Sequence, residues 1–180
     1  MQRALLVIDM TYDFIADDGA LPCGEAGQKI VNPILQAVQT AHQNGDFVIF
    51  ACDAHAIDDK EFQLWPVHCV AGTKGAQLIE PLNQFYATYE SDQVRYLPKT
   101  KYDAFFETPL AMWLQEKGVQ EVLVCGVCTS ICCYATALGA YYRGYQVVID
   151  PALMADLTPE AHEFAVLQME NVLKAQRLSN

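Results

Sequence analysis

Four short, nearly continuous runs of apolar and β-branched residues divide the chain. They cover residues 4–9, 46–53, 121–127 and 145–150. Uninterrupted apolar runs of this length are typical of strands that are covered on both faces, as in a parallel sheet. Residues 93–99 form a weaker fifth candidate, because Pro98 cannot donate to a sheet and has to lie near the end of the strand.

Helical patterns separate these candidate strands. They cover residues 25–43, 108–117, 131–143 and a segment that begins at Thr158. The second and the fourth open with threonine followed by proline, a favoured cap and first helical residue. Glycine follows the second and the third, as expected at helix ends. The alternation predicts an α/β fold, a three-layer α/β/α sandwich with a mostly parallel central sheet, in a single domain spanning residues 1–180.

The composition limits the classes of partner that the protein can bind. Of the 180 residues, 52% are hydrophobic and 18% are charged, as in compact folded proteins. The 22 acidic and 11 basic side chains give a formal charge of −11, which disfavours nucleic acid and anionic membrane surfaces as partners. The opening MQRALLVIDM reads as a first strand rather than a cleaved signal, so we expect a cytoplasmic protein without a disulfide framework.

Polar and reactive side chains follow the candidate strands at their carboxyl ends. Asp9, Asp53 and Lys99 end three of them, and a cysteine cluster comes directly after Val127. In open parallel sheets, ligands bind beyond these strand ends. The sequence therefore predicts a functional site at this edge of the sheet.

Three cysteines lie where a strand gives way to a helix: Cys128, Cys132 and Cys133. Most cysteines are buried and inert. The positive end of a helix, however, lowers a thiol pKa and can stabilise an oxyanion. Position alone does not choose between Cys132 and Cys133. A base and a cation for such a nucleophile are available in Asp9 and Lys99.

Two further segments carry candidate chemistry. Asp53, His55, Glu61 and His68 suit a divalent transition metal, although an Asp-x-His pair also occurs as a plain hydrogen-bonded loop. Residues 97–110 contain two lysines and the aromatic pair Phe105 and Phe106. They indicate either an exposed sheet edge or a lysine beside the thiol with an aromatic pocket.

Four ordered motifs together resemble the isochorismatase-like cysteine hydrolases, and most closely the bacterial nicotinamidases. They are ALLVIDMTYDFIADDGAL, ACDAH with EFQLWPVHCVAGTKG, KTKYDAFFETPL, and VLVCGVCTSICCYATALGAYYRGY. The resemblance runs over nearly the whole chain. It implies the isochorismatase-like hydrolase fold and an amidase that converts nicotinamide to nicotinate and ammonia in NAD salvage, through a cysteine thioester.

The resemblance also implies roles for individual residues. Its catalytic triad falls on Asp9, Lys99 and Cys132. A cis peptide bond is expected before Cys128, with the N–H groups of Cys128 and Cys132 forming an oxyanion hole.

The same resemblance implies a metal site, a substrate pocket and an assembly. The metal, zinc, manganese or iron, would be held by Asp53, His55, Glu61 and His68. The pocket walls would include Phe14, Trp65 and Tyr102. The partner would be a small-molecule amide, and a homo-oligomer is expected.

The chain departs from the family pattern at a few positions. Ser130, Asp103 and Cys133 replace the usual aspartate, serine and aliphatic residue, and the loop between His55 and Glu61 is shorter. The alternatives are a related hydrolase of another small amide, a ureido compound or an isochorismate-like substrate, a non-catalytic binding protein, and a thiol redox protein that uses the clustered cysteines.

Overall fold

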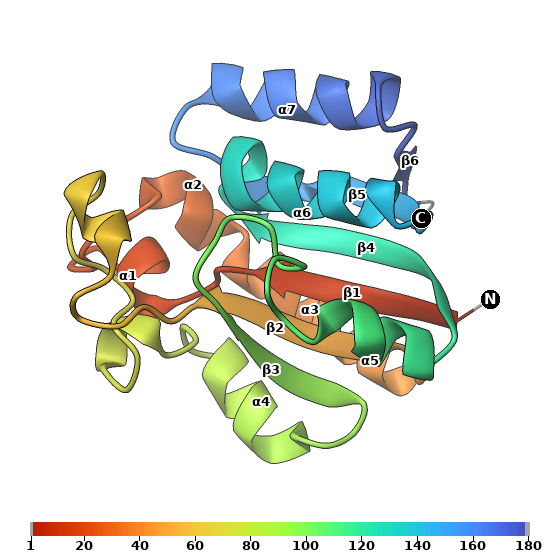
Figure 1. Ribbon diagram of the computed structural model, residues 1–180, viewed down its shortest axis with the longest axis horizontal. Helices are drawn as coiled ribbons and strands as arrows, with labels where there is room; N and C mark the ends of the chain where they lie inside the picture. The colour runs from red at the N-terminus through yellow and green to blue at the C-terminus, as the bar shows by residue number, and fades with distance from the viewer. Residues whose placement is uncertain (1, 179–180) are drawn as a thin grey trace.

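A computed structural model describes residues 2–178 and contains one six-stranded sheet (Figure 1). Its strands are β1 (Gln2–Ile8), β2 (Phe47–Asp53), β3 (Val94–Lys99), β4 (Val119–Val127), β5 (Gln146–Ala155) and β6 (Gln176–Arg177). The order across the sheet is β3-β2-β1-β4-β5-β6, and every neighbouring pair is parallel. The predicted fold class and parallel sheet are confirmed.

Helices cover both faces of the sheet. They are α1 (Tyr12–Ile15), α2 (Gly24–Lys29), α3 (Val31–Gln43), α4 (Leu82–Tyr89), α5 (Leu110–Glu116), α6 (Tyr134–Tyr142) and α7 (Pro159–Asn171). Helices α5, α6 and α7 share one apolar cluster with the sheet, and α1, α3 and α4 share the other. Burial on both faces explains why the strands are continuous apolar runs, and all seven residues of β2 are buried.

The helix predicted over residues 25–43 is two helices, α2 and α3. Ile30 separates them, with its amide bonded to Gln28. Pro33 lies in the first turn of α3 and has no N–H to donate back to Lys29, so a continuous helix would lose that bond. A proline is tolerated where a new helix begins, and the chain therefore restarts the helix at Val31.

Several other elements differ from their predicted extents. The edge strand β3 accommodates Pro98 and is confirmed. Strand β5 continues five residues beyond the predicted end at residue 150. The helix predicted over 131–143 opens with a π-helical turn, η3 (Thr129–Cys133). Neither α4 nor the two-residue β6 was predicted.

Gly126 permits a close approach at the end of the sheet. Its φ is 115°, and a Cβ at this position would lie 2.0 Å from the carbonyl oxygen of Ile8. Only glycine therefore lets the end of β4 pack against the end of β1. This approach places the residues that follow β4 next to Asp9. Within residues 2–178, we find no helix whose length and apolar character would allow it to cross a membrane.

Helix α7 depends on a side-chain cap that can be tested. Thr158 accepts a hydrogen bond from the N–H of Ala161 at 3.2 Å. We expect Thr158→Ala to lower the free energy of unfolding by about 1 kcal/mol, because this N–H loses its partner. The thermal midpoint should then fall by about 2–4 °C, while Thr158→Ser should match the wild type. An unchanged midpoint in Thr158→Ala would contradict this role.

Candidate active site

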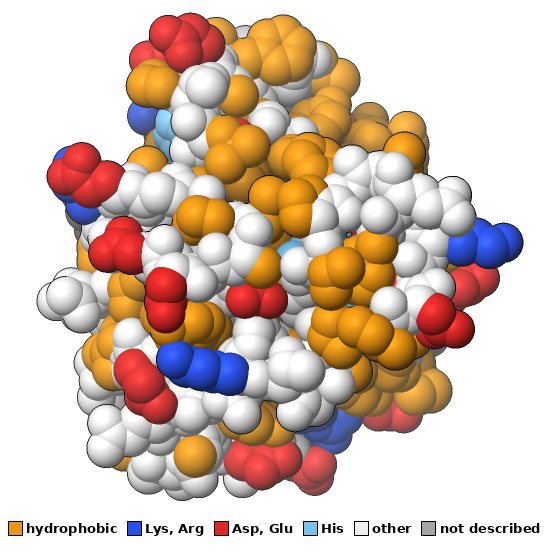
Figure 2. Space-filling model, turned by 90° about the vertical axis from the view of Figure 1, so that its left-hand side faces the viewer, with side chains coloured by type: hydrophobic (Ala, Val, Ile, Leu, Met, Phe, Trp, Pro, Cys, Tyr) orange, Lys and Arg blue, Asp and Glu red, His pale blue; other side chains and the backbone are white. Residues whose placement is uncertain are grey.

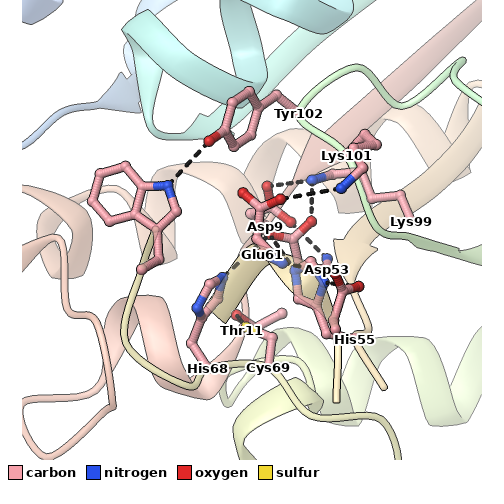
Figure 3. A network of polar contacts seen from close by, with 12 residues as sticks. Asp9, Thr11, Asp53, His55, Glu61, His68, Cys69, Lys99, Lys101 and Tyr102 are labelled. Atoms are coloured by element: carbon pink, nitrogen blue, oxygen red, sulfur yellow. Dashed lines mark hydrogen bonds and ion pairs between the residues drawn. The ribbon is translucent and has the colours of Figure 1, made fainter. Parts of the chain in front are cut away.

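Three adjacent strands deliver charged side chains to one point at the edge of the sheet (Figure 3). Asp9 follows β1, Asp53 ends β2, and Lys99 ends β3, directly opposite Asp53 in the strand register. Asp9 has a φ of 54°, a left-handed conformation that aspartate adopts more readily than most residues. Its Oδ1 accepts the backbone N–H of Asp53 at 2.8 Å, so the two carboxylates are held side by side.

The Lys99 ammonium lies between these two carboxylates. Its Nζ is 2.8 Å from Asp9 Oδ2 and 2.6 Å from Asp53 Oδ1, and all three residues are buried. Burial alone would lower the pKa of Lys99, but Asp9, Cys132 and Asp53 together raise it well above its ordinary value. Lys99 is therefore a fixed cation, and Lys101 lies outside the cluster with its side chain half exposed.

Cys132 completes this group from the π-helical turn η3. Its Sγ and carboxylate oxygens of Asp9 and Asp53 all lie within 4.8 Å of one another. The peptide bond between Val127 and Cys128 is cis, as the resemblance implied. The structure thus brings together the three residues of the predicted triad. Cys132 lines the pocket described below and Cys133 does not, which favours Cys132 as the reactive thiol.

Burial strongly affects the pKa values of Cys132 and Asp9. It raises the pKa of the Cys132 thiol well above its usual range, and Lys99 only partly opposes the shift. The expectation that the helix end would lower this pKa is wrong, because the buried site penalises the thiolate more strongly. Burial and repulsion from Asp53 raise the pKa of Asp9 to about 6, although Lys99 opposes the rise. Asp9 is therefore ionised at neutral pH and remains basic enough to accept a proton.

A pocket opens above Cys132 at this end of the molecule. It is lined by Asp9, Phe14, Leu21, Asp53, Glu61, Trp65, His68, Tyr102, Val127, Cys128, Ile131, Cys132 and Leu157. Figure 2 views the molecule from this end and shows hydrophobic side chains gathered around a central hollow. All three predicted wall residues, Phe14, Trp65 and Tyr102, line the pocket, and Trp65 Nε1 donates to Tyr102 Oη at 3.0 Å.

The aromatic pair predicted as pocket wall does not serve that purpose. Phe105 packs into the core, where its ring stacks on Tyr145 with centroids 6.1 Å apart. Phe106 is half exposed and is absent from the pocket lining. Of residues 97–110, Lys99 joins the charged cluster and Tyr102 lines the pocket.

Three candidate metal ligands converge beside Lys99. Ligand atoms of Asp53, His55 and His68 lie within 4.8 Å of one another. Asp53 Oδ2 is 3.5 Å from His55 Nε2 and 3.9 Å from His68 Nε2. Asp53 thus presents Oδ1 to Lys99 and Oδ2 to the imidazoles. Glu61, the fourth predicted ligand, lines the pocket, but its carboxylate pairs with Lys101 Nζ at 3.1 Å and is not part of this close group.

Residues outside the predicted site hold the two imidazoles in place. Asp59 Oδ2 pairs with His55 Nδ1 at 3.0 Å, and its Oδ1 accepts the N–H of Glu61 at 2.9 Å. His68 Nδ1 bonds the carbonyl of Pro66 at 2.7 Å. Both Nδ1 atoms are therefore occupied, which turns both Nε2 atoms toward Asp53. The sequence showed Asp59 only as one acid among several in a loop.

The turn that carries Cys132 is also held from other elements. The N–H of Ser130 donates to Asp156 Oδ2 at 2.6 Å, and Thr129 Oγ1 bonds His162 Nδ1 at 2.8 Å. Asp156 follows β5 and is buried, while His162 is on α7. These partners lie more than twenty residues away along the chain, and no local signal in the sequence identified them.

The chain is similar to known proteins over nearly its whole length. Residues 3–177 match the isochorismatase domain. The nicotinamidase/pyrazinamidase PncA from Bacillus subtilis is 39% identical and superposes with a TM-score of 0.96 over 99% of this chain and 100% of that one. The pyrazinamidase/nicotinamidase from Streptococcus mutans UA159 is 40% identical, with a TM-score of 0.96 over 98% and 100%. The pyrazinamidase of Pyrococcus horikoshii, solved in complex with zinc, is 29% identical, with a TM-score of 0.89 over the full length of both chains.

The two lysines near the site should differ sharply in their effect on stability. Lys99→Met leaves two buried carboxylates without their cation, so we expect the free energy of unfolding to fall by about 3–5 kcal/mol. Lys101→Met removes a partly exposed ion pair and should change it by less than about 1 kcal/mol. Urea unfolding at pH 7 measures both. Equal losses in the two variants would contradict the buried ion-pair description.

Proposed function

This chain belongs to the isochorismatase family, and we propose that it is an amidohydrolase that converts nicotinamide to nicotinate and ammonia. Nicotinamidases related to it over nearly the full length of both chains support the reaction. The observation that carries the proposal is the contact of Asp9, Lys99 and Cys132 at the base of an apolar pocket.

Asp9 is the proton acceptor in this proposal. It takes the thiol proton of Cys132 as the sulfur adds to the amide carbon, so the thiolate forms only when a carbonyl is present to receive it. Lys99 remains charged and offsets the negative charge that develops beside it. A buried, neutral resting thiol is consistent with this order of events.

The remaining steps return the enzyme to its starting state. The N–H groups of Cys128 and Cys132 hold the oxyanion, and each such donor contributes about 3 kcal/mol. Asp9 gives its proton to the departing ammonia, and a Cys132 thioester remains. Asp9 then accepts a proton from water that attacks the thioester, which releases nicotinate and restores the thiol.

The pocket walls suit a flat aromatic amide. Phe14, Trp65 and Ile131 give an apolar enclosure that excludes bulk water from the sulfur. The hydrogen bond between Trp65 and Tyr102 fixes two of the rings that surround the ligand. A small planar substrate would bury its ring against these walls and direct its amide toward Cys132.

The donor set fits a divalent transition metal. His55 Nε2 is buried without a hydrogen-bond partner, and a metal ion would satisfy it. Asp53, His55 and His68 would hold the ion, with Glu61 near enough to the pocket to contribute if it leaves Lys101. When bound, the ion supplies a Lewis acid that can attract the ring nitrogen of the substrate. The zinc complex of the Pyrococcus relative supports this assignment, and zinc, manganese and iron all suit these ligands.

Substitutions at two neighbouring cysteines test the identity of the nucleophile. We expect Cys132→Ala to reduce ammonia release from nicotinamide by about 10⁴-fold or more, because no thioester can form. Cys133→Ala removes a thiol of the same size that only packs in the core, and it should retain most of the wild-type rate. Retention of the wild-type rate by Cys132→Ala would defeat the mechanism. A wild-type protein that releases no ammonia from nicotinamide would defeat the substrate assignment.

Metal binding is tested through Asp59 rather than through a ligand. Asp59 uses each of its two carboxylate oxygens for one hydrogen bond, whereas asparagine has a single side-chain oxygen. In Asp59→Asn, either His55 Nδ1 or the Glu61 N–H therefore loses its acceptor. We expect Asp59→Asn to weaken Zn²⁺ binding to the metal-free protein about 10–100-fold by titration calorimetry. Asp58→Asn makes the same change of charge at an exposed neighbour and should bind as the wild type does. Equal affinity of both variants would contradict the positioning role.

A further inference from the structure

Two further cysteines lie close together at the pocket, and their thiols have no part in the proposed reaction. Cys23 precedes α2, and Cys128 precedes η3. The two residues are 105 positions apart in the sequence, yet their sulfur atoms are 3.9 Å apart. From this contact we propose that Cys23 and Cys128 are a redox modification site, where a hydroperoxide forms a reversible disulfide that switches off the active site.

The two sulfurs need only a small movement to bond. A disulfide has an S–S distance of about 2.05 Å, so the thiols must approach each other by roughly 2 Å. Both residues belong to loops that flank short helical turns rather than to the middle of a strand. Cys128 is half-buried and lines the pocket, which gives a small oxidant a route to the pair.

The surroundings distinguish the roles of the two thiols. The hydrogen bond from the Cys128 thiol lowers the pKa of Cys23, although burial opposes it. The same pairing, together with burial, raises the pKa of Cys128. Cys23 is therefore the more readily ionised member, and the thiolate is the form that reacts with peroxides.

The chemistry is balanced by one molecule of hydroperoxide. The Cys23 thiolate attacks one peroxide oxygen, the O–O bond breaks, and Cys23 becomes a sulfenic acid. With hydrogen peroxide, the other oxygen leaves as water. The Cys128 sulfur then displaces the sulfenic hydroxyl, which forms the S–S bond and releases a second water. Two thiols lose two electrons in total, and the peroxide gains them.

The disulfide would act on the turn that carries the nucleophile. Cys128 is four residues before Cys132 and belongs to the same pocket wall. A disulfide between Cys128 and Cys23, in the loop before α2, would move this wall away from the substrate. Displacements of about 1 Å in an active site cost around 100-fold in rate, so we expect a loss of about 10-fold or more.

Peptide mapping tests the bond directly. Trypsin places Cys23 alone in residues 4–29 and Cys128 in residues 118–143. After treatment with hydrogen peroxide, we expect these two peptides to be recovered as one cross-linked species, with fragmentation assigning the bond to Cys128. A dithiol reductant should separate them. Recovery of residues 4–29 with a free thiol after activity is lost would overturn the proposal.

Kinetics on two variants test the consequence. Cys23→Ala should resist reversible inactivation by peroxide, losing ammonia-releasing activity about 10-fold more slowly than the wild type. Cys125→Ala removes a buried strand thiol instead and should lose activity at the wild-type rate. Equal rates in Cys23→Ala and the wild type would overturn the switch. The activity readout rests on the proposed function. If untreated protein released no ammonia, that function would fail while the peptide map would still decide the disulfide.

Discussion

A single buried ammonium group organises this end of the molecule. Lys99 contacts a carboxylate oxygen of Asp9 on one side and of Asp53 on the other, and all three residues are buried. Two carboxylates this close would repel each other in a buried site without an intervening cation. Asp9 faces the Cys132 thiol, and Asp53 turns its second oxygen toward the two imidazoles. One cation therefore couples the proposed nucleophile to the proposed metal site, and the parallel order of β1, β2 and β3 is what brings the three charges together.

The fold and most of the site could be predicted from the sequence because both depend on local patterns. Strands buried on both faces leave continuous apolar runs, and the first charged residue after each run marks the strand end. Asp9 and Asp53 are such residues, whereas Lys99 ends the weaker run of the edge strand β3, which is only partly buried and also contains Arg95. Choosing Lys99 over Lys101, or Cys132 over Cys133, needed the family resemblance, because spacing does not reveal register. In the structure Lys99 lies opposite Asp53. Strand β3 ends at Lys99, so Lys101 lies outside the sheet.

The features that escaped prediction depend on contacts between distant segments. The support of Ser130 by Asp156 and the proximity of Cys23 to Cys128 both join parts of the chain that carry no common pattern. Helix α4 is short and β6 has two residues, so neither leaves a periodic signal of useful length. The pKa of Cys132 was misjudged for a related reason. The dipole of a helix end can be inferred from a strand-to-helix boundary, whereas the degree of burial depends on everything packed around it.

Burial and hydrogen bonding give Cys132 and the Cys23–Cys128 pair different chemistry. A dry site raises the cost of charge, so the Cys132 thiol ionises only when Asp9 can take its proton. Cys128 is closer to solvent, and its hydrogen bond favours the ionised form of Cys23. Oxidation should therefore reach the wall of the pocket before it reaches the nucleophile. A disulfide in the wall is reversible, whereas overoxidation of a lone nucleophile is not. The pair thus offers a reversible way to stop turnover while the catalytic sulfur stays intact.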